Sequence, residues 1–254
     1  MADAAGTGPW RLLDGPAGVL HAYATPTAPG SPPVPALLLC HELPRERGSA
    51  PDVGRTYPAL ADRLGLESGF KVATGLLRGA GGSEGDFSAA GWLEDLRFLA
   101  DHEVGDDGAL WLVGFDLGGV LALRLAAEDQ RVRGVACLGA PADPAVWAAD
   151  PDALLRRCRA TGVITSRGFP PDVDRWAAEL GDLRPIEAAH QLDDRPLLVV
   201  HGSEDPDVPS AAARALADAA SGPVELRLVP GAGHWLRADP RVVATLIGWV
   251  ERQR

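Results

Sequence analysis

The chain has 254 residues, of which 46% are hydrophobic and 23% are charged, a composition that excludes a disordered or fibrous protein. Its net charge of −11 disfavours a nucleic-acid-binding or anionic-membrane-binding surface, because both need clustered Lys and Arg. No apolar run approaches the ~18 residues of a membrane span, and the N-terminus lacks the basic and apolar regions of a signal peptide. We therefore expect a cytoplasmic protein with one domain, residues 1–254, whose oligomeric state the sequence leaves open.

The cysteine content is typical of a reducing compartment. The chain has three cysteines, none in a CxxC pair and two within apolar runs where a buried thiol is expected: Cys40, Cys137 and Cys158. Its histidines and cysteines do not show metal-ligand spacing, so we expect no metal and no cofactor.

The first predicted element is a β-hairpin over residues 10–25 around the turn residues DGPAG, followed by a Pro-rich connection through Pro35. Six short, mostly apolar segments then suit strands buried on both faces of a parallel sheet: residues 36–40, 71–77, 109–115, 132–138, 196–201 and 224–229. Helices are predicted at residues 54–67, 88–104, 117–128, 210–220 and 239–252. This alternation predicts a mostly parallel, doubly wound α/β sheet with its active site at the carboxyl ends of the strands.

Residues 141–191 interrupt the alternation. They separate two predicted strands and contain two helix-like pieces together with Trp147 and Trp176. An insertion of this size beyond the strand ends is typical of a short helical lid. The alternative is a pair of connecting helices that only cover the sheet.

At the end of the predicted strand 109–115, Gly114 and Gly118 flank Asp116 in the segment VGFDLGG. A tight turn from strand to helix would present the side chain of residue 116 above the sheet. Glycines are needed beside it because neighbouring Cβ atoms would clash. The pattern alone is common, so its context decides how it is interpreted.

Two later strand ends supply that context. Asp205 follows the strand at 196–201, and His234 follows the strand at 224–229. Asp207 is an alternative acid, although the position of Asp205 fits better. Nucleophile position, acid and histidine thus occur in a chain order that some hydrolases share.

Over residues 18–252 the chain resembles an α/β-hydrolase, on the blocks LLLCHELP, RGAGGSEGDF and HGSEDPDVP. These blocks are most similar to those of small bacterial serine esterases and acyl-peptidase-like hydrolases. The resemblance implies the α/β-hydrolase fold and a small-molecule substrate. It also implies a catalytic triad with Asp116 at the nucleophile position, Asp205 orienting the imidazole, and His234 as the base.

The same resemblance places an oxyanion hole at the backbone N–H groups of Leu43 and Leu117. Two positions depart from the family pattern. The nucleophilic serine is replaced by Asp116, and the glycine of the family's His-Gly pair is replaced by Glu42.

An aspartate at this position resembles the nucleophile of haloalkane dehalogenases and epoxide hydrolases, and HELP is similar to their His-Gly-x-Pro. There the carboxylate attacks an sp3 carbon that bears a halide or an epoxide oxygen, and water activated by histidine hydrolyses the resulting ester. Two features differ here. Leu117 replaces the tryptophan usual in dehalogenases, and Tyr23 and Tyr57 lie outside residues 141–191, where a lid tyrosine of an epoxide hydrolase would be expected.

Glu42 leaves two alternatives to covalent hydrolysis. If its carboxylate lay close to that of Asp116, the two would share a proton, which suits non-hydrolytic acid–base chemistry such as that of a lyase or cyclase. The chain could also be a hydrolase frame that has lost its nucleophile and now serves as a binding protein. The intact pair of Asp205 and His234 favours catalysis.

Several other side chains are candidates for the site. His41 and His201, at strand ends, are expected to fix loops by hydrogen bonding, and Arg78 is expected to tie loops together through its guanidinium group. A tryptophan N–H could assist a leaving halide, and three tryptophans are candidates: Trp147, Trp176 and Trp235.

Overall fold

A computed structural model describes residues 9–26, 36–104 and 108–253 of the chain. The N-terminal residues 1–8 and most of the predicted Pro-rich connection, residues 27–35, lie outside this described part. The strands are β1 (Trp10–Gly15), β2 (Gly18–Ala24), β3 (Ala36–Cys40), β4 (Lys71–Leu76), β5 (Leu110–Phe115), β6 (Val132–Leu138), β7 (Leu197–Gly202) and β8 (Val224–Val229). The α-helices are α1 (Val53–Ser68), α2 (Ala89–Val104), α3 (Leu117–Glu128), α4 (Pro151–Thr161), α5 (Val173–Asp182), α6 (Pro185–His190), α7 (Ala211–Ala219) and α8 (Pro240–Glu251). Three short 3-10 helices complete the described elements: η1 (Ala50–Asp52), η2 (Pro144–Ala149) and η3 (Leu236–Ala238).

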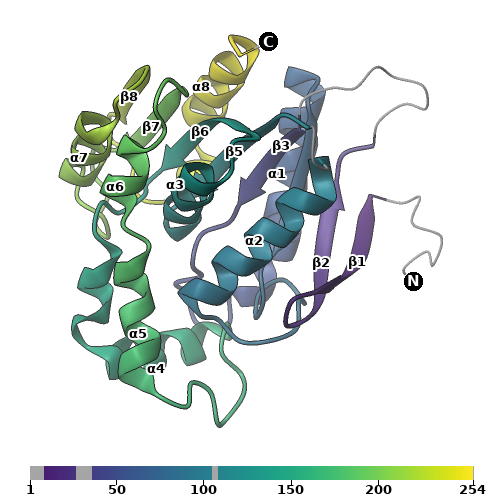
Figure 1. Cartoon of the computed structure of the whole chain (residues 1–254), viewed down its shortest axis with the longest axis vertical. Coiled ribbons are helices and arrows are strands. Elements are labelled where there is room, and N and C mark those ends of the chain that lie inside the picture. The colour runs from purple at the N-terminus through teal and green to yellow at the C-terminus, as the bar shows by residue number, and fades with distance from the viewer. Residues whose placement is uncertain (1–8, 27–35, 105–107, 254) are drawn as a thin grey trace.

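The eight strands form one sheet in the order β1-β2-β4-β3-β5-β6-β7-β8 (Figure 1). β2 pairs antiparallel with β1 and with β4, and the other neighbouring strands are parallel. The predicted hairpin and the mostly parallel α/β sheet are therefore confirmed. The bounds of the predicted strands and helices differ from the observed ones by one residue at most.

The side chains of β3 show how the layers are built. Leu38 and Cys40 pack in a cluster with residues of α2 and α3, whereas Leu37 and Leu39 pack in a second cluster with residues of α1 and α8. Successive side chains of a strand point to opposite faces, so these two pairs of helices cover opposite faces of the sheet (Figure 1). A strand buried on both faces explains the continuous apolar sequence ALLLC.

Residues 141–191 contain more helix than the two pieces that we predicted, namely η2, α4, α5 and α6. α6 packs against α3 and α7 and covers the sheet, whereas α5 packs against η2, α4 and α2. In Figure 1, α4 and α5 lie together at the end of the molecule farthest from α8. The segment therefore combines a connecting helix with a separate helical cluster.

The three cysteines are free and buried, as the sequence predicts. Burial raises the pKa of the Cys158 thiol to about 12 and places the pKa of Cys40 and Cys137 still higher. No helix within the described ranges has both the length and the apolar character needed to cross a membrane.

Candidate functional site

Asp116 lies in the turn between β5 and α3 with φ 52° and ψ −122°, a strained conformation for a non-glycine residue. Its backbone N–H donates to the carbonyl of Leu138 at 2.8 Å, which holds the turn against β6. The predicted need for glycine on both sides is confirmed. A Cβ on Gly118 would lie 2.4 Å from the carbonyl oxygens of Cys40 and His41, and a Cβ on Gly114 would lie 2.2 Å from the backbone of α3.

The loops after β7 and β8 bring the predicted acid and histidine together. Nδ1 of His234 lies 2.8 Å from Oδ2 of Asp205, and Nε2 lies 3.6 Å from Oδ1 of Asp116. With Nδ1 donating to Asp205, a neutral His234 keeps a lone pair on Nε2 facing the elbow. The alternative acid Asp207 does not contact the imidazole in this way, because its carboxylate faces Arg45 at 3.6 Å.

Asp205 is held by more than His234. Its Oδ1 accepts hydrogen bonds from the backbone N–H groups of Asp207 and Val208, and its Oδ2 lies 3.3 Å from Nε2 of His201. Burial alone would raise the pKa of Asp205, but the hydrogen bonds from His201, His234 and the backbone outweigh burial and hold that pKa well below its ordinary value. Asp205 is therefore a fixed negative charge next to His234.

Arg45, from the loop after β3, contacts the elbow directly. Its Nη2 donates to Oδ1 of Asp116 at 2.8 Å, and its guanidinium lies over the ring of Trp147, 5.3 Å from the centroid. The Asp116 side chain is 2% exposed, so Arg45 supplies the main counter-charge of a buried carboxylate. The other carboxylate oxygen, Oδ2, has no hydrogen-bond partner among the described residues.

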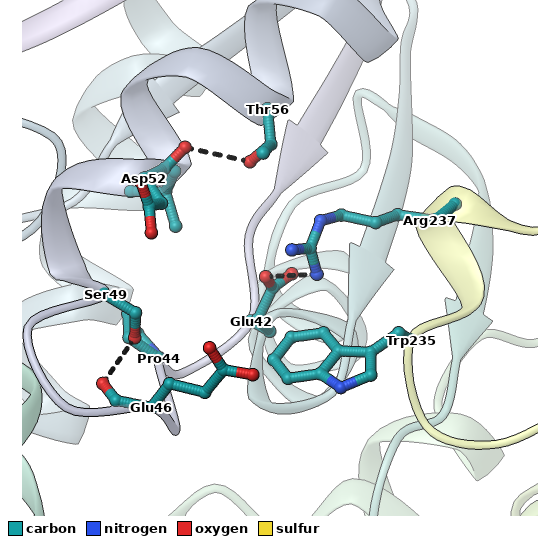
Figure 2. A pocket seen from close by; sticks show the side chains of 10 residues that line it. Glu42, Pro44, Glu46, Ser49, Asp52, Thr56, Trp235 and Arg237 are labelled. Atoms are coloured by element: carbon teal, nitrogen blue, oxygen red, sulfur yellow. Dashed lines mark hydrogen bonds and ion pairs between the residues drawn. The ribbon is translucent and has the colours of Figure 1, made fainter.

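The Glu42 side chain has partners of its own. It accepts a hydrogen bond from the buried hydroxyl of Tyr57 and forms an ion pair of 2.6 Å with Arg237, which comes from η3 (Figure 2). The Glu42 side chain is 6% exposed, so its charge is neutralised within the protein. Glu42 and Asp116 are thus each paired with a different arginine.

Two cavities meet beside these carboxylates. A space of about 10 Å³ is bordered by Asp116, His234 and Trp235, which is about the room that one water molecule needs. A larger cavity of about 300 Å³ (Figure 2) shares Trp235, Glu42 and Arg237 with it. The site is therefore open toward one side but nearly filled at the elbow itself.

Two candidate residues tie loops together. His41 is fully buried, with Nδ1 2.8 Å from the carbonyl of Glu42, and its Nε2 accepts from the N–H of Leu77 at 3.1 Å. Arg78 donates from Nε and Nη2 to the buried carboxylate of Asp95. Both contacts match the structural roles that the sequence predicts.

The two predicted oxyanion residues, Leu43 and Leu117, follow the ends of β3 and β5. Leu117 opens α3, so its N–H belongs to the first helical turn, where amides lack an acceptor within the helix. Leu43 is buried directly after Glu42. Their role in stabilising an oxyanion stays a prediction.

The three tryptophans take different positions. The prediction that Trp176 could assist a leaving halide is wrong, because its Nε1 donates to the carbonyl of Phe87 at 2.9 Å. Trp235 is 41% exposed, lies edge-on to His234 and lines both cavities. Trp147 carries the Arg45 guanidinium on its ring.

Sequence reasoning missed the arginines of the site. Arg45 lies two positions beyond Leu43 in HELPRER, and Arg237 lies three positions beyond His234 in GHWLRAD. Their position in loops that follow strand ends was the available signal. These short segments do not predict which carboxylate each arginine pairs with.

One group could offer ligands to a metal ion. Asp205, Asp207 and His234 each present a ligand atom, and these atoms lie within 4.8 Å of one another. A cation there would compete with the hydrogen bond from His234 to Asp205 and with the positive charge of Arg45 beside Asp207. The donor set therefore fits an acid–imidazole relay better than a metal centre.

Comparison with known proteins identifies the family of the chain. A model described as "Alpha/beta hydrolase family" matches residues 37–246. No curated protein sequence matches the chain.

Solved structures show the same fold. An alpha-beta serine hydrolase homologue from Coxiella burnetii is 22% identical with a TM-score of 0.61, and the alignment covers 99% of both chains. Est1E from Butyrivibrio proteoclasticus is 16% identical with a TM-score of 0.71 over 97% of both chains. A serine hydrolase without lid from Xanthomonas campestris is 21% identical with a TM-score of 0.63, covering 99% of this chain and 95% of that one. The family match over most of the sequence and the shared fold lead to one conclusion: the chain belongs to the alpha/beta hydrolase family.

Proposed function

We propose that the chain is a hydrolase of a small organic molecule, with Asp116 as the nucleophile, His234 as the base and Asp205 as the residue that orients it. The observation that carries this proposal is the state of the elbow carboxylate. Oδ2 is buried and has no hydrogen-bond partner within the part of the chain that the structure describes, while Oδ1 is held by Arg45 and faces His234. One oxygen is thus free to attack while the other is fixed.

In the first step, Oδ2 of Asp116 forms a bond to an sp3 carbon of the substrate, and the bond from that carbon to its leaving group breaks. A halide leaves with the electron pair and needs no proton. The N–H groups of Leu43 and Leu117 would stabilise negative charge on the ester oxygen when water attacks.

In the second step, a water molecule loses a proton to Nε2 of His234 and attacks the carboxyl carbon of Asp116. The tetrahedral intermediate releases the alkoxide, which takes the proton from His234, and the new carboxyl group ionises to regenerate the enzyme. The space of about 10 Å³ between Asp116 and His234 is large enough for this water.

The helical cluster of residues 141–191 would act as a lid in this mechanism. Trp147 of η2 carries Arg45 on its ring, so the insertion contacts the residue that covers the nucleophile. A movement of η2 would change the position of Arg45 and uncover Asp116.

Proton sharing between Asp116 and Glu42 has little support. That alternative requires two uncompensated carboxylates, whereas Arg45 pairs with one of them and Arg237 with the other. The shared proton that an acid–base reaction without a covalent intermediate would need is therefore not favoured.

A binding protein on a hydrolase frame is the second candidate. The observation in its favour is that Arg45 joins Asp116 and Asp207, so the elbow carboxylate is already paired. If that pair never opened, no substrate would reach Oδ2.

Intact-protein mass spectrometry separates the two candidates. We would incubate a His234→Gln variant with a panel of epoxides, haloalkanes and activated esters, because loss of the base should trap the alkyl ester on Asp116. We expect a mass increase that is absent when Asp116→Asn is added to the same variant. His190→Gln, a change at an exposed position on α6, is the matched control and should not accumulate an adduct.

A folded His234→Gln protein that gains no mass with any compound would contradict the nucleophile and favour the binding protein. Circular dichroism of each variant would establish that it is folded.

A further inference from the structure

Arg45, the arginine next to the elbow, has a neighbouring arginine that forms no ion pair with the described residues. Arg157, on α4, lies over the ring of Trp147 with its guanidinium carbon 5.4 Å from the centroid, and Arg45 lies over the same ring at 5.3 Å. Two positive groups thus share one indole. Within the described residues, Arg45 is paired with Asp116 and Asp207, whereas Arg157 forms no ion pair.

The unpaired atoms of Arg157 form one edge of its guanidinium. Nε and Nη2 are buried and have no hydrogen-bond partner among the described residues, and Nε of Arg45 is in the same state. Buried donors without acceptors are costly and rare, so each such group calls for an explanation. Burial lowers the pKa of Arg157, and the nearby charge of Arg45 lowers it further, although nearby carboxylates act in the opposite direction.

The same edge binds carboxylates elsewhere in this protein. Arg78 uses Nε and Nη2 to hold Asp95, and Arg131 uses Nε and Nη2 to hold Asp129. Two parallel N–H groups match the two oxygens of a carboxylate. In Arg157 this edge has no carboxylate partner among the described residues, so its capacity for a bidentate contact is unused there.

A cavity borders Trp147, the side chain on which both guanidinium groups lie. It has a volume of about 310 Å³, and its wall includes Trp147 and Asp207, two of the three side chains that contact Arg45. The rest of its wall is mostly apolar and includes Pro141, Ala142, Val146, Val208 and Ala212. Because Trp147 lies between this apolar wall and the two guanidinium groups, the arrangement suits a ligand with an apolar body and one anionic group.

We propose that Arg157, together with Arg45, binds a carboxylate group of the substrate, so that the site takes small organic monocarboxylates whose apolar part occupies the cavity beside Trp147. This inference deepens the proposed function and rests on it, because the bound carboxylate is a substrate only if the chain is a hydrolase. A carboxylate that pairs with Arg157 would also compete for Arg45 and weaken its hold on Asp116. Binding of the correct ligand would thereby free the nucleophile.

Binding is measured without turnover. We would titrate the unchanged protein with hexanoate and with hexanamide, its uncharged counterpart of the same shape, by isothermal titration calorimetry. We expect hexanoate to bind at least about tenfold more tightly than hexanamide, because a charge-assisted bidentate contact is worth more than about 1.4 kcal/mol. Acetate should bind more weakly than hexanoate if the apolar cavity contributes.

Arg157→Met removes the proposed contact, and Arg156→Gln is the matched control, because Arg156 is the next residue on α4 and its side chain is 71% exposed. We expect Arg157→Met to lose about tenfold in hexanoate affinity with no change for hexanamide, and Arg156→Gln to bind both as the unchanged protein does. The Arg157→Met protein should fold, because the change removes two buried N–H donors that have no partner among the described residues and keeps an apolar side chain of similar length. Its melting temperature without ligand should be unchanged or higher.

Equal affinity for hexanoate and hexanamide, or full hexanoate affinity in Arg157→Met, would overturn this inference and leave ordered water as the partner of Arg157. The result is separable from the fate of the nucleophile. Hexanoate binding without any covalent adduct on His234→Gln would keep the carboxylate site and reject Asp116 catalysis. An adduct with neutral compounds only, together with no preference for hexanoate, would support Asp116 as the nucleophile and reject the carboxylate site.

Discussion

On one side of Asp116, the ends of β7 and β8 bring Asp205 and His234 into a relay that the family resemblance implies. On the other side, the loop after β3 brings Glu42 and Arg45, which that resemblance does not imply. The first side is held largely by backbone amides and two imidazoles, whereas the second is held by long side chains that neutralise one another. The difference shows that an acid–histidine pair can stand beside a loop that departs from the family pattern when Asp116 and Glu42 each gain their own cation.

The largest expected effect is at the glycine where the two sides touch. Gly118→Ala would place a Cβ 2.4 Å from the backbone oxygens of Cys40 and His41, which no side-chain rotation relieves. We expect a loss of about 3 kcal/mol in the free energy of unfolding, measured by urea denaturation. Gly233→Ala, beside His234, is the matched control, because the nearest atom to its Cβ lies 4.0 Å away, and its cost should stay within about 0.5 kcal/mol. Equal costs at the two positions would show that the turn and the end of β3 are not in rigid contact.

A smaller effect is expected within the loop after β3. Glu42→Gln would leave Arg237 without its charge partner and weaken the bond from Tyr57, so the free energy of unfolding should fall by about 2 kcal/mol. Glu46→Gln, an exposed change in the same loop, should stay within about 0.5 kcal/mol of the unchanged protein. Should the two variants unfold at the same urea concentration, the Glu42 pair would not be what stabilises this side.

The smallest expected effect concerns the relay and depends on pH. Asp205→Asn should lower the free energy of unfolding by about 1.5 kcal/mol at neutral pH, because it replaces a carboxylate that accepts several hydrogen bonds. The pKa of Asp205 is lower in the folded chain than in the unfolded chain, so its contribution is complete above the unfolded value of about 3.9 and is lost as the pH falls toward the folded value. The difference between the two proteins should therefore shrink below about pH 4.

Urea unfolding at several pH values would measure this trend. Asp218→Asn, at an exposed position on α7, is the matched control and should change the free energy of unfolding by less than about 0.5 kcal/mol at neutral pH. A difference between Asp205→Asn and the unchanged protein that stayed constant down to pH 3 would contradict the role of the depressed pKa.

The helical insertion shows that sequence periodicity does not predict short helices. Residues 141–191 interrupt the alternation of strands and helices, and this interruption identified the segment as an insertion. Its division into four helical pieces was not predicted. Short helices such as α6 (Pro185–His190) carry too few residues for a period to be recognised. Their position is set by packing against α3 and α7.

By itself, the sequence determined the order of strands and helices, the elbow around Asp116 and the succession of Asp205 and His234. These follow from local periodicity and from strand ends that parallel pairing brings to one edge of the sheet. Only the tertiary structure decided which charges meet: Asp116 with Arg45, Glu42 with Arg237, and Arg157 with no carboxylate of the described chain. The physical reason is that Arg45 and Asp116 lie 71 positions apart, and the reach of a flexible guanidinium depends on how separate loops pack above the sheet.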